Sequence, residues 1–166
     1  MEKNAFTKIM ASWLEQHLKT QYGAENNVKV LIPTSNISKV PDPDIKKHIP
    51  NYSSLDFAPD VLGILTNKKS PEKIGLVFLN RSVSAISLKE IGEMQCYCRL
   101  ANPAEAFIAS TKGVPREIAV LLFDSNICHS LLSYHNNKSI TLFTWDEAKN
   151  DIDQLRIYPI KTDNKP

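Results

Sequence analysis

The chain has 166 residues, which is enough for one domain with a hydrophobic core of its own. Hydrophobic residues make up 42% of it and charged residues 23%, so the composition is that of a globular protein and excludes a disordered chain. The formal net charge of +2 is too small to indicate a nucleic-acid-binding surface by itself, because such proteins usually carry a stronger or more clustered positive charge.

The three cysteines predict reduced thiols in a cytoplasmic protein and no disulfide framework. Cys96 and Cys98 stand two apart on a predicted helix, so they point to nearly opposite sides of it, and Cys128 is distant in the sequence. The lack of a CxxC pair argues against structural zinc. Because the first residues lack the apolar run of a signal peptide and no apolar stretch approaches the ~20 residues of a membrane span, we expect no membrane partner.

The first third of the chain predicts a helix, a strand and a long loop. In residues 4–22 the apolar side chains recur at a spacing of three and four, which is typical of an amphipathic helix, and Gly23 ends it. Residues 28–33 alternate and are β-branched, so they predict a strand. Residues 34–54 contain three prolines and predict a loop with a helical turn near 44–48.

The middle of the chain predicts the centre of a sheet. Residues 57–66 and 73–80 read as two strands joined by a polar turn. The second strand is almost wholly apolar, which indicates a central strand covered on both faces. A helix over 88–100 and a strand over 105–110 follow. A right-handed crossover through that helix would make the strands 73–80 and 105–110 parallel.

The predicted helix 88–100 has a clear start signal. Ser87 is expected to be its N-cap, and Glu90 three residues later completes a capping box. The apolar stripe predicts that the helix buries four side chains, which are Leu88, Ile91, either Met94 or Gln95, and Cys98.

The last third predicts helices over 115–123 and 126–134, a strand over 139–145 and an edge strand at 155–160. The element order is therefore αβββαβαα(β), which is that of an α/β fold. We expect one domain over residues 1–166, with a core of about 4–146 and a polar tail after 150.

Polar side chains mark the ends of the two central strands. Asp60 follows Pro59 at the start of the first strand, and the second strand ends in Phe78-Leu79-Asn80. An acidic strand beside a second strand with a polar end is a usual way to build a metal-dependent phosphodiesterase site. An aspartate after proline is also ordinary turn chemistry, so both interpretations of Asp60 stay open.

The helix after these strands contains the phrase LKEIGEMQCYC, in which Glu93 and Tyr97 stand four residues apart. Taken together, residues 55–110 resemble the PD-(D/E)xK nuclease superfamily, whose members often carry Q-x-x-x-Y in this helix. Glu93 takes the glutamine place. The resemblance extends to the N-terminal helix, where Glu15 is the candidate for a glutamate that members often have.

The resemblance implies a restriction-endonuclease-like αβββαβ core, in which helices flank a central mixed sheet. It also implies Mg²⁺, held by two carboxylates and one main-chain carbonyl, with a lysine beside them. Asp60 is the implied first carboxylate and Leu79 supplies the carbonyl. Phe78 stands where the second carboxylate is expected and Asn80 where the lysine is expected. Phenylalanine cannot bind a metal and asparagine carries no charge, so a scaffold that has lost its cleavage site is the simplest interpretation.

The first functional hypothesis is a nuclease-like domain that binds without cleaving, in defence or DNA repair. Its partner would be nucleic acid, with DNA the first candidate, or another protein. The candidate contacts to phosphate are four lysines, Lys46, Lys47, Lys68 and Lys69. Many members of the superfamily are dimers, so the resemblance also implies a homodimer.

Two other hypotheses stay open, so enzymatic activity is undecided. An active Mg²⁺-dependent nuclease could use Asp60, the Leu79 carbonyl and a carboxylate that has migrated to Glu93, with Tyr97 continuing the same helix face. Arg81 and Lys89 are candidates for the missing lysine, although Arg81 should point to the side of its strand opposite to Asn80. A structural or assembly subunit could instead use the loop 34–54 and the edge strand 155–160 as a protein interface.

Overall fold

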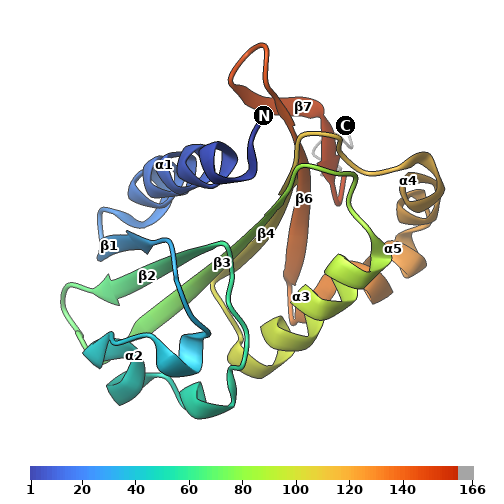
Figure 1. Cartoon of the computed structure of the whole chain (residues 1–166). Coiled ribbons are helices and arrows are strands. Elements are labelled where there is room, and N and C mark those ends of the chain that lie inside the picture. The colour runs from blue at the N-terminus through green and yellow to red at the C-terminus, as the bar shows by residue number, and fades with distance from the viewer. Residues whose placement is uncertain (161–166) are drawn as a thin grey trace.

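The structure is a computed structural model that describes residues 1–160. Within them the chain forms an α/β fold in which helices flank a mixed seven-stranded sheet (Figure 1). The helices are α1 (Lys3–Tyr22), α2 (Pro43–His48), α3 (Leu88–Ala101), α4 (Arg116–Phe123) and α5 (Ser125–Leu132). The strands are β1 (Asn26–Leu31), β2 (Val61–Asn67), β3 (Ile74–Ser82), β4 (Glu105–Ser110), β5 (Ser133–His135), β6 (Lys138–Asp146) and β7 (Asp151–Tyr158).

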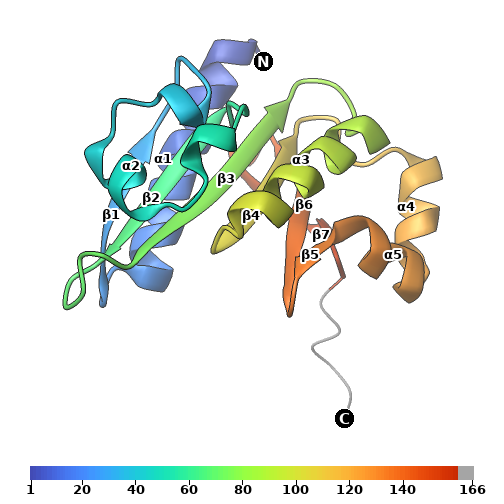
Figure 2. The same cartoon turned by 90° about the horizontal axis from the view of Figure 1, so that it is seen from below.

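The strands lie in the order β1-β2-β3-β4-β6-β5, and β7 also pairs with β6. β2 is antiparallel to both of its neighbours, β1 and β3, whereas β3, β4 and β6 run parallel. The predicted parallel pairing across α3 is confirmed, since Val77 of β3 pairs with Glu105 of β4. Figure 2 shows α2 on the side of β1–β3 and the helices α3, α4 and α5 on the side of β4–β6.

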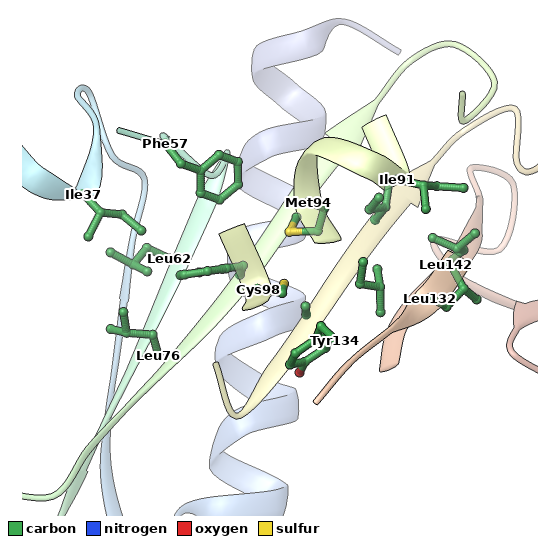
Figure 3. Close-up of a cluster of buried hydrophobic side chains, with 14 of the residues drawn as sticks. Ile37, Phe57, Leu62, Leu76, Ile91, Met94, Cys98, Leu132, Tyr134 and Leu142 are labelled. Carbon is green, nitrogen blue, oxygen red and sulfur yellow. The ribbon is translucent and has the colours of Figure 1, made fainter. Parts of the chain in front are cut away.

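Each face of the sheet is covered by its own core. On one face, which we call the α1-side core, α1 packs against β2, β3 and β4 through Phe6, Met10, Leu14, Leu18, Val61, Val77, Leu79, Phe107 and Ala109. On the other face, the α3-side core joins α3 to the loop before β2 and to α5, with Ile37, Phe57, Leu62, Leu76, Ile91, Met94, Cys98 and Leu132 among its residues (Figure 3). The prediction that residues 73–80 form a strand covered on both faces is therefore confirmed.

Helix α3 begins with the predicted capping box. The Glu90 carboxylate accepts a hydrogen bond from the Ser87 backbone N–H at 2.7 Å, and the Ser87 hydroxyl oxygen accepts one from the Glu90 N–H at 3.3 Å. The buried stripe runs through Ile91, Met94 and Cys98. The prediction that Leu88 is buried is wrong, because Ile86, which precedes the helix, fills the core at this end and leaves Leu88 47% exposed.

The segment before β2 differs from the prediction. The strand expected from residue 57 begins only at Val61, since Phe57 turns into the α3-side core and Pro59 has no N–H for a ladder. The helical turn expected near 44–48 is confirmed as α2, which Asp42 caps. Two short 3₁₀ turns, at Ile37–Lys39 and Tyr52–Ser54, lie on either side of it.

Strand β7 is an irregular edge. The prediction placed it at 155–160, whereas it begins at Asp151 because the two residues Trp145 and Asp146 of β6 already pair with its first residues. The register shifts between Phe143 and Trp145, so the middle of β7 bulges away from β6. Leu155 in this bulge is 93% exposed. Bulges of this kind protect an edge from pairing with another chain.

Candidate functional site

The candidate site lies where β2 begins and β3 ends. Val61 pairs with Leu79 in the antiparallel ladder, so the next residues outward, Asp60 and Asn80, face each other across the strands. The backbone N–H of Asp60 donates to the Asn80 side-chain oxygen at 3.3 Å. The residue opposite Asp60 is therefore Asn80. Phe78 lies two residues farther into the sheet, where it pairs with Leu62.

The carboxylate of Asp60 is bound by Arg81. One of its oxygens accepts a hydrogen bond from the Arg81 backbone N–H at 2.9 Å, and the other lies 3.4 Å from the Arg81 Nη2. The Arg81 Nε donates to the Thr7 hydroxyl of α1 at 2.8 Å, and Thr7 in turn donates to the Lys3 carbonyl at 3.1 Å. The Arg81 side chain is only 6% exposed and that of Asp60 30% exposed. A buried cation thus neutralises the one carboxylate of the motif.

The two remaining residues of the strand motif belong to the cores. Phe78 is fully buried in the α3-side core, where its ring meets Phe57 edge-on at a centroid distance of 5.5 Å. The Leu79 side chain is buried in the α1-side core. The next residue on the face of Phe78 and Asn80 is Ser82, whose hydroxyl is 2.9 Å from that of Ser84. Asn80 and Ser82, the two residues of β3 that follow Phe78 on this face, are therefore both uncharged.

The candidates on α3 lie over the loop before β2. The Tyr97 ring stacks on Phe57 with centroids 4.5 Å apart, and its hydroxyl donates to the Asp56 carbonyl at 3.0 Å. Burial, and then the negative charges of Asp56 and Glu93, raise the pKa of Tyr97 above its ordinary value. Tyr97 therefore serves as a neutral donor that fixes the loop to the helix, and Glu93 is exposed beside it.

Asp60 and Glu93 lie on different faces of the sheet. Helices α1 and α3 lie on opposite sides of the sheet (Figure 1). Helix α3 packs on the face that contains Phe78, whereas the Asp60 carboxylate turns to Arg81, which reaches Thr7 on α1. The structure therefore does not bring these two carboxylates together. Glu15, the candidate glutamate of α1, pairs with Lys19 at 2.6 Å on the exposed side of its helix.

The donor set around Asp60 does not fit Mg²⁺. This ion prefers near-octahedral oxygen coordination, usually with one or two carboxylates. Asp60 is the single carboxylate here and Arg81 already holds it, while the Asn80 oxygen accepts a backbone N–H. Across residues 1–160, no three His, Cys, Asp or Glu side chains gather into a group that could hold a metal ion.

A cavity of about 470 Å³ opens beside the Asp60–Arg81 pair. The N-terminal turns of α1 form one wall, and the ends of β1 and of the loop before β2 form the other. The lining residues are Asn4, Thr7, Lys8, Ile32, Pro33, Thr34, Ala58, Pro59, Asp60 and Arg81. Lys8 and Arg81 are cationic and Asp60 is anionic, so the lining has a formal net charge of +1, which favours an anionic group.

The four predicted lysines do not line this cavity. Lys46 and Lys47 are exposed in the last turn of α2. The Lys68 ammonium donates to the Gly23 carbonyl at 2.6 Å and so holds the β2–β3 turn to the end of α1. Lys69 is exposed in the same turn.

Sequence reasoning missed Thr7 and Lys8 and misplaced the role of Arg81. Strand alternation correctly predicted that Arg81 points away from the face of Asn80. Strand alternation could not predict that the Asp60 carboxylate turns to the same side of the sheet as Arg81. Asp60 precedes the first paired residue of β2, so alternation does not constrain the direction of its side chain. The polar residues Asn4 and Lys8, spaced four apart in α1, were the available signal for the wall of the cavity.

The chain matches no protein-family model, and a search of curated proteins found no match. Among the helices of residues 1–160, none has both the length and the apolar character needed to cross a membrane.

Proposed function

We propose that the chain is a nuclease-like domain with a restriction-endonuclease-like core that binds nucleic acid at the Asp60–Arg81 end of the sheet and does not cleave it. The observation that carries the proposal is the pairing of the Asp60 carboxylate with the buried Arg81 guanidinium. A guanidinium can contact a phosphate but cannot activate water as a metal ion does.

The order of the elements supports the scaffold in this proposal. Helix α1, the antiparallel strands β1–β3, helix α3 and the parallel strand β4 follow one another as αβββαβ, if the short helix α2 is taken as part of a loop. Asp60 lies at the start of the second strand of this core, and Asn80 faces it from the third. This is the relative position in which the resemblance places the catalytic residues.

The loss of cleavage follows from the chemistry of the residues at the site. Metal-assisted phosphodiester cleavage needs ligands that hold the ion and a group that positions water. Asn80 and Ser82, which follow Phe78 on its strand face, are neutral, and Glu93 lies across the sheet from the Asp60 carboxylate. An active nuclease that uses Asp60, the Leu79 carbonyl and Glu93 is therefore the weaker candidate.

A protein-binding role has one observation in its favour. Phe123 and Val120 of α4 are 67% and 60% exposed, and exposed apolar patches often mark protein interfaces. The sequence-based candidate for such an interface was the loop 34–54 together with the edge strand, and the bulge of β7 makes this edge less able to pair with another chain. A partner protein or a second copy of the chain is therefore proposed second, with α4 as its contact.

The salt dependence of binding tests the proposal. We expect a labelled oligonucleotide to bind with an affinity that falls as salt is added, because phosphate contacts release counterions. The same samples, supplied with Mg²⁺ or Mn²⁺, should yield no cleavage products. Cleavage that disappears in both Asp60→Ala and Glu93→Ala would instead establish the active nuclease. Failure to bind single-stranded DNA, double-stranded DNA and RNA would leave the protein-binding role.

A further inference from the structure

Two neighbouring cavities share one residue of α1. The first is the cavity of about 470 Å³ beside Arg81, and the second is a cavity of about 600 Å³ farther along the helix. Lys8 lines both. The second cavity is lined by Lys8, Ile9, Ser12, Trp13, Gln16, Trp145, Asn150 and Asp151.

The polar residues of α1 connect these cavities. Asn4, Lys8, Ser12 and Gln16 are spaced four apart, so they lie in one row on the helix surface, and all four are exposed. From Asn4 to Gln16 the row covers about 18 Å of helix, at a rise of about 1.5 Å per residue. We call this row with its two cavities the α1 groove.

The two ends of the α1 groove differ in chemistry. At the first end, Arg81 uses Nε and Nη2 for Thr7 and Asp60, and within residues 1–160 its Nη1 has no hydrogen-bond partner. An arginine guanidinium held in this way, with an exposed lysine beside it, suits a phosphate. At the other end both tryptophans of the chain, Trp13 and Trp145, line the wall.

The aromatic end is built rigidly. The Trp13 indole stacks on the His17 ring with centroids 5.2 Å apart and an interplanar angle of 14°, and Phe143 lies 5.0 Å away. Trp13 is half-buried, so part of its ring reaches the groove. Aromatic side chains beside a cationic backbone site are the usual combination in proteins that bind single strands, because every base can stack on them.

We infer that the α1 groove binds a single-stranded nucleic acid, with a phosphate between Lys8 and Arg81 and a base against Trp13. This inference rests on the proposed function. Each cavity has a volume within the range of about 300–1,000 Å³ typical of small-ligand sites, which suits single nucleotide units. A duplex keeps its base faces stacked and cannot present one to Trp13.

The affinity is limited by the charges of the groove. The residues that line the groove carry two cations, Lys8 and Arg81, and two carboxylates, Asp60 and Asp151, so their formal charges sum to zero. Binding that neutralises one phosphate has a shallow salt dependence, with a slope of log K against log salt of about −0.7 for a single strand.

The test is a titration with a labelled thymidine 12-mer, in which fluorescence anisotropy reports affinity and tryptophan emission reports occupancy of the groove. We expect the oligonucleotide to quench the emission. Lys8→Ala should weaken binding by about tenfold and make the salt slope shallower by about 0.7. Asp151→Asn should tighten binding, and Lys73→Ala, at an exposed lysine in the β2–β3 turn, should leave it unchanged.

Three outcomes would overturn the inference while leaving nucleic-acid binding without cleavage intact. The first is binding with unchanged tryptophan emission and unchanged affinity in Lys8→Ala. The second is a larger loss in a Lys46→Ala/Lys47→Ala variant than in Lys8→Ala. The third is a duplex of the same length that binds as tightly as the single strand. No change in anisotropy with any nucleic acid would overturn the proposed function itself.

Discussion

At the scale of single residues, the Asp60–Arg81 pair connects the candidate site to helix α1, because Arg81 contacts both Asp60 and Thr7. Arg81 is almost fully buried, whereas 30% of the Asp60 side chain stays in contact with water. Removing one partner of a buried pair costs more than removing both, because the remaining charge loses its compensation. The pair should therefore show strong energetic coupling.

We predict that Asp60→Ala lowers the free energy of unfolding by more than Arg81→Met does. Asp60→Ala leaves a buried guanidinium unpaired, whereas Arg81→Met leaves a carboxylate that water can reach. The double variant should lose about 1–2 kcal/mol less than the sum of the single losses. Urea unfolding of the four proteins measures this coupling. Losses that add within about 0.5 kcal/mol would contradict an energetically significant pair.

Asp42 supplies a prediction about pH. Burial works to raise the pKa of Asp42, but the hydrogen bond from Lys29 at 2.6 Å and those from the backbone N–H groups of Ile45 and Asp44 outweigh it and lower the pKa. A carboxylate whose pKa is lowered on folding contributes stability above its unfolded pKa, about 3.9, and loses it as pH falls through the folded value.

Asp42→Asn should therefore be less stable than the parent at pH 7, and the difference should shrink below about pH 4. Asparagine caps a helix about as well as aspartate, so Asp42→Asn reports the contribution of the charge alone to the free energy of unfolding. Asp42→Ala should lose about 1 kcal/mol more, because it also removes the cap of α2. Thermal unfolding between pH 3 and 7 measures both. A difference that is constant over this range would contradict the assignment to Asp42.

At the scale of elements, local signals predicted α3 well and β2 and β7 less well. The capping box at Ser87 and the stripe through Ile91 lie within the helix itself, so a local pattern suffices to find them. The start of β2 depends on Phe57 entering a core built from distant segments. The bulge of β7 depends on its pairing with β6, which no local pattern encodes.

Two glycines test the packing of these elements. A Cβ on Gly92 of α3 would meet no atom within 4 Å, whereas one on Gly63 of β2 would lie 2.7 Å from the Leu18 Cδ1 and 3.0 Å from the Val77 Cβ. Gly92→Ala should stabilise the protein by about 0.5–1 kcal/mol, because alanine restricts the unfolded chain and favours the helix. Gly63→Ala should destabilise it by about 1–3 kcal/mol through overpacking.

Chemical denaturation of the two variants, with the parent as reference, measures whether the free energy of unfolding rises in Gly92→Ala and falls in Gly63→Ala. Equal effects of Gly92→Ala and Gly63→Ala on the unfolding midpoint would contradict the close approach of α1 to β2.

At the scale of the whole molecule, the sheet separates the groups that a metal site would need to combine. One core joins α1 to the sheet and the other joins α3 to it, so Asp60, which turns to α1, and Glu93, which lies on α3, belong to different faces. The sequence alone was sufficient to predict the α/β class and the neutral motif residues. It was not sufficient to predict the α1 groove, because that surface combines α1 with the ends of β1 and β3 and with the β6–β7 turn.

The central claim is that the Asp60–Arg81 end of the sheet binds nucleic acid without cutting it. The most direct measurement incubates one labelled oligonucleotide with the protein and Mn²⁺, then divides the sample between a native gel and a denaturing gel. We predict a shifted band on the native gel and a full-length oligonucleotide on the denaturing gel. Shortened products that Asp60→Ala abolishes, or an oligonucleotide that remains unshifted at every protein concentration, would contradict the claim.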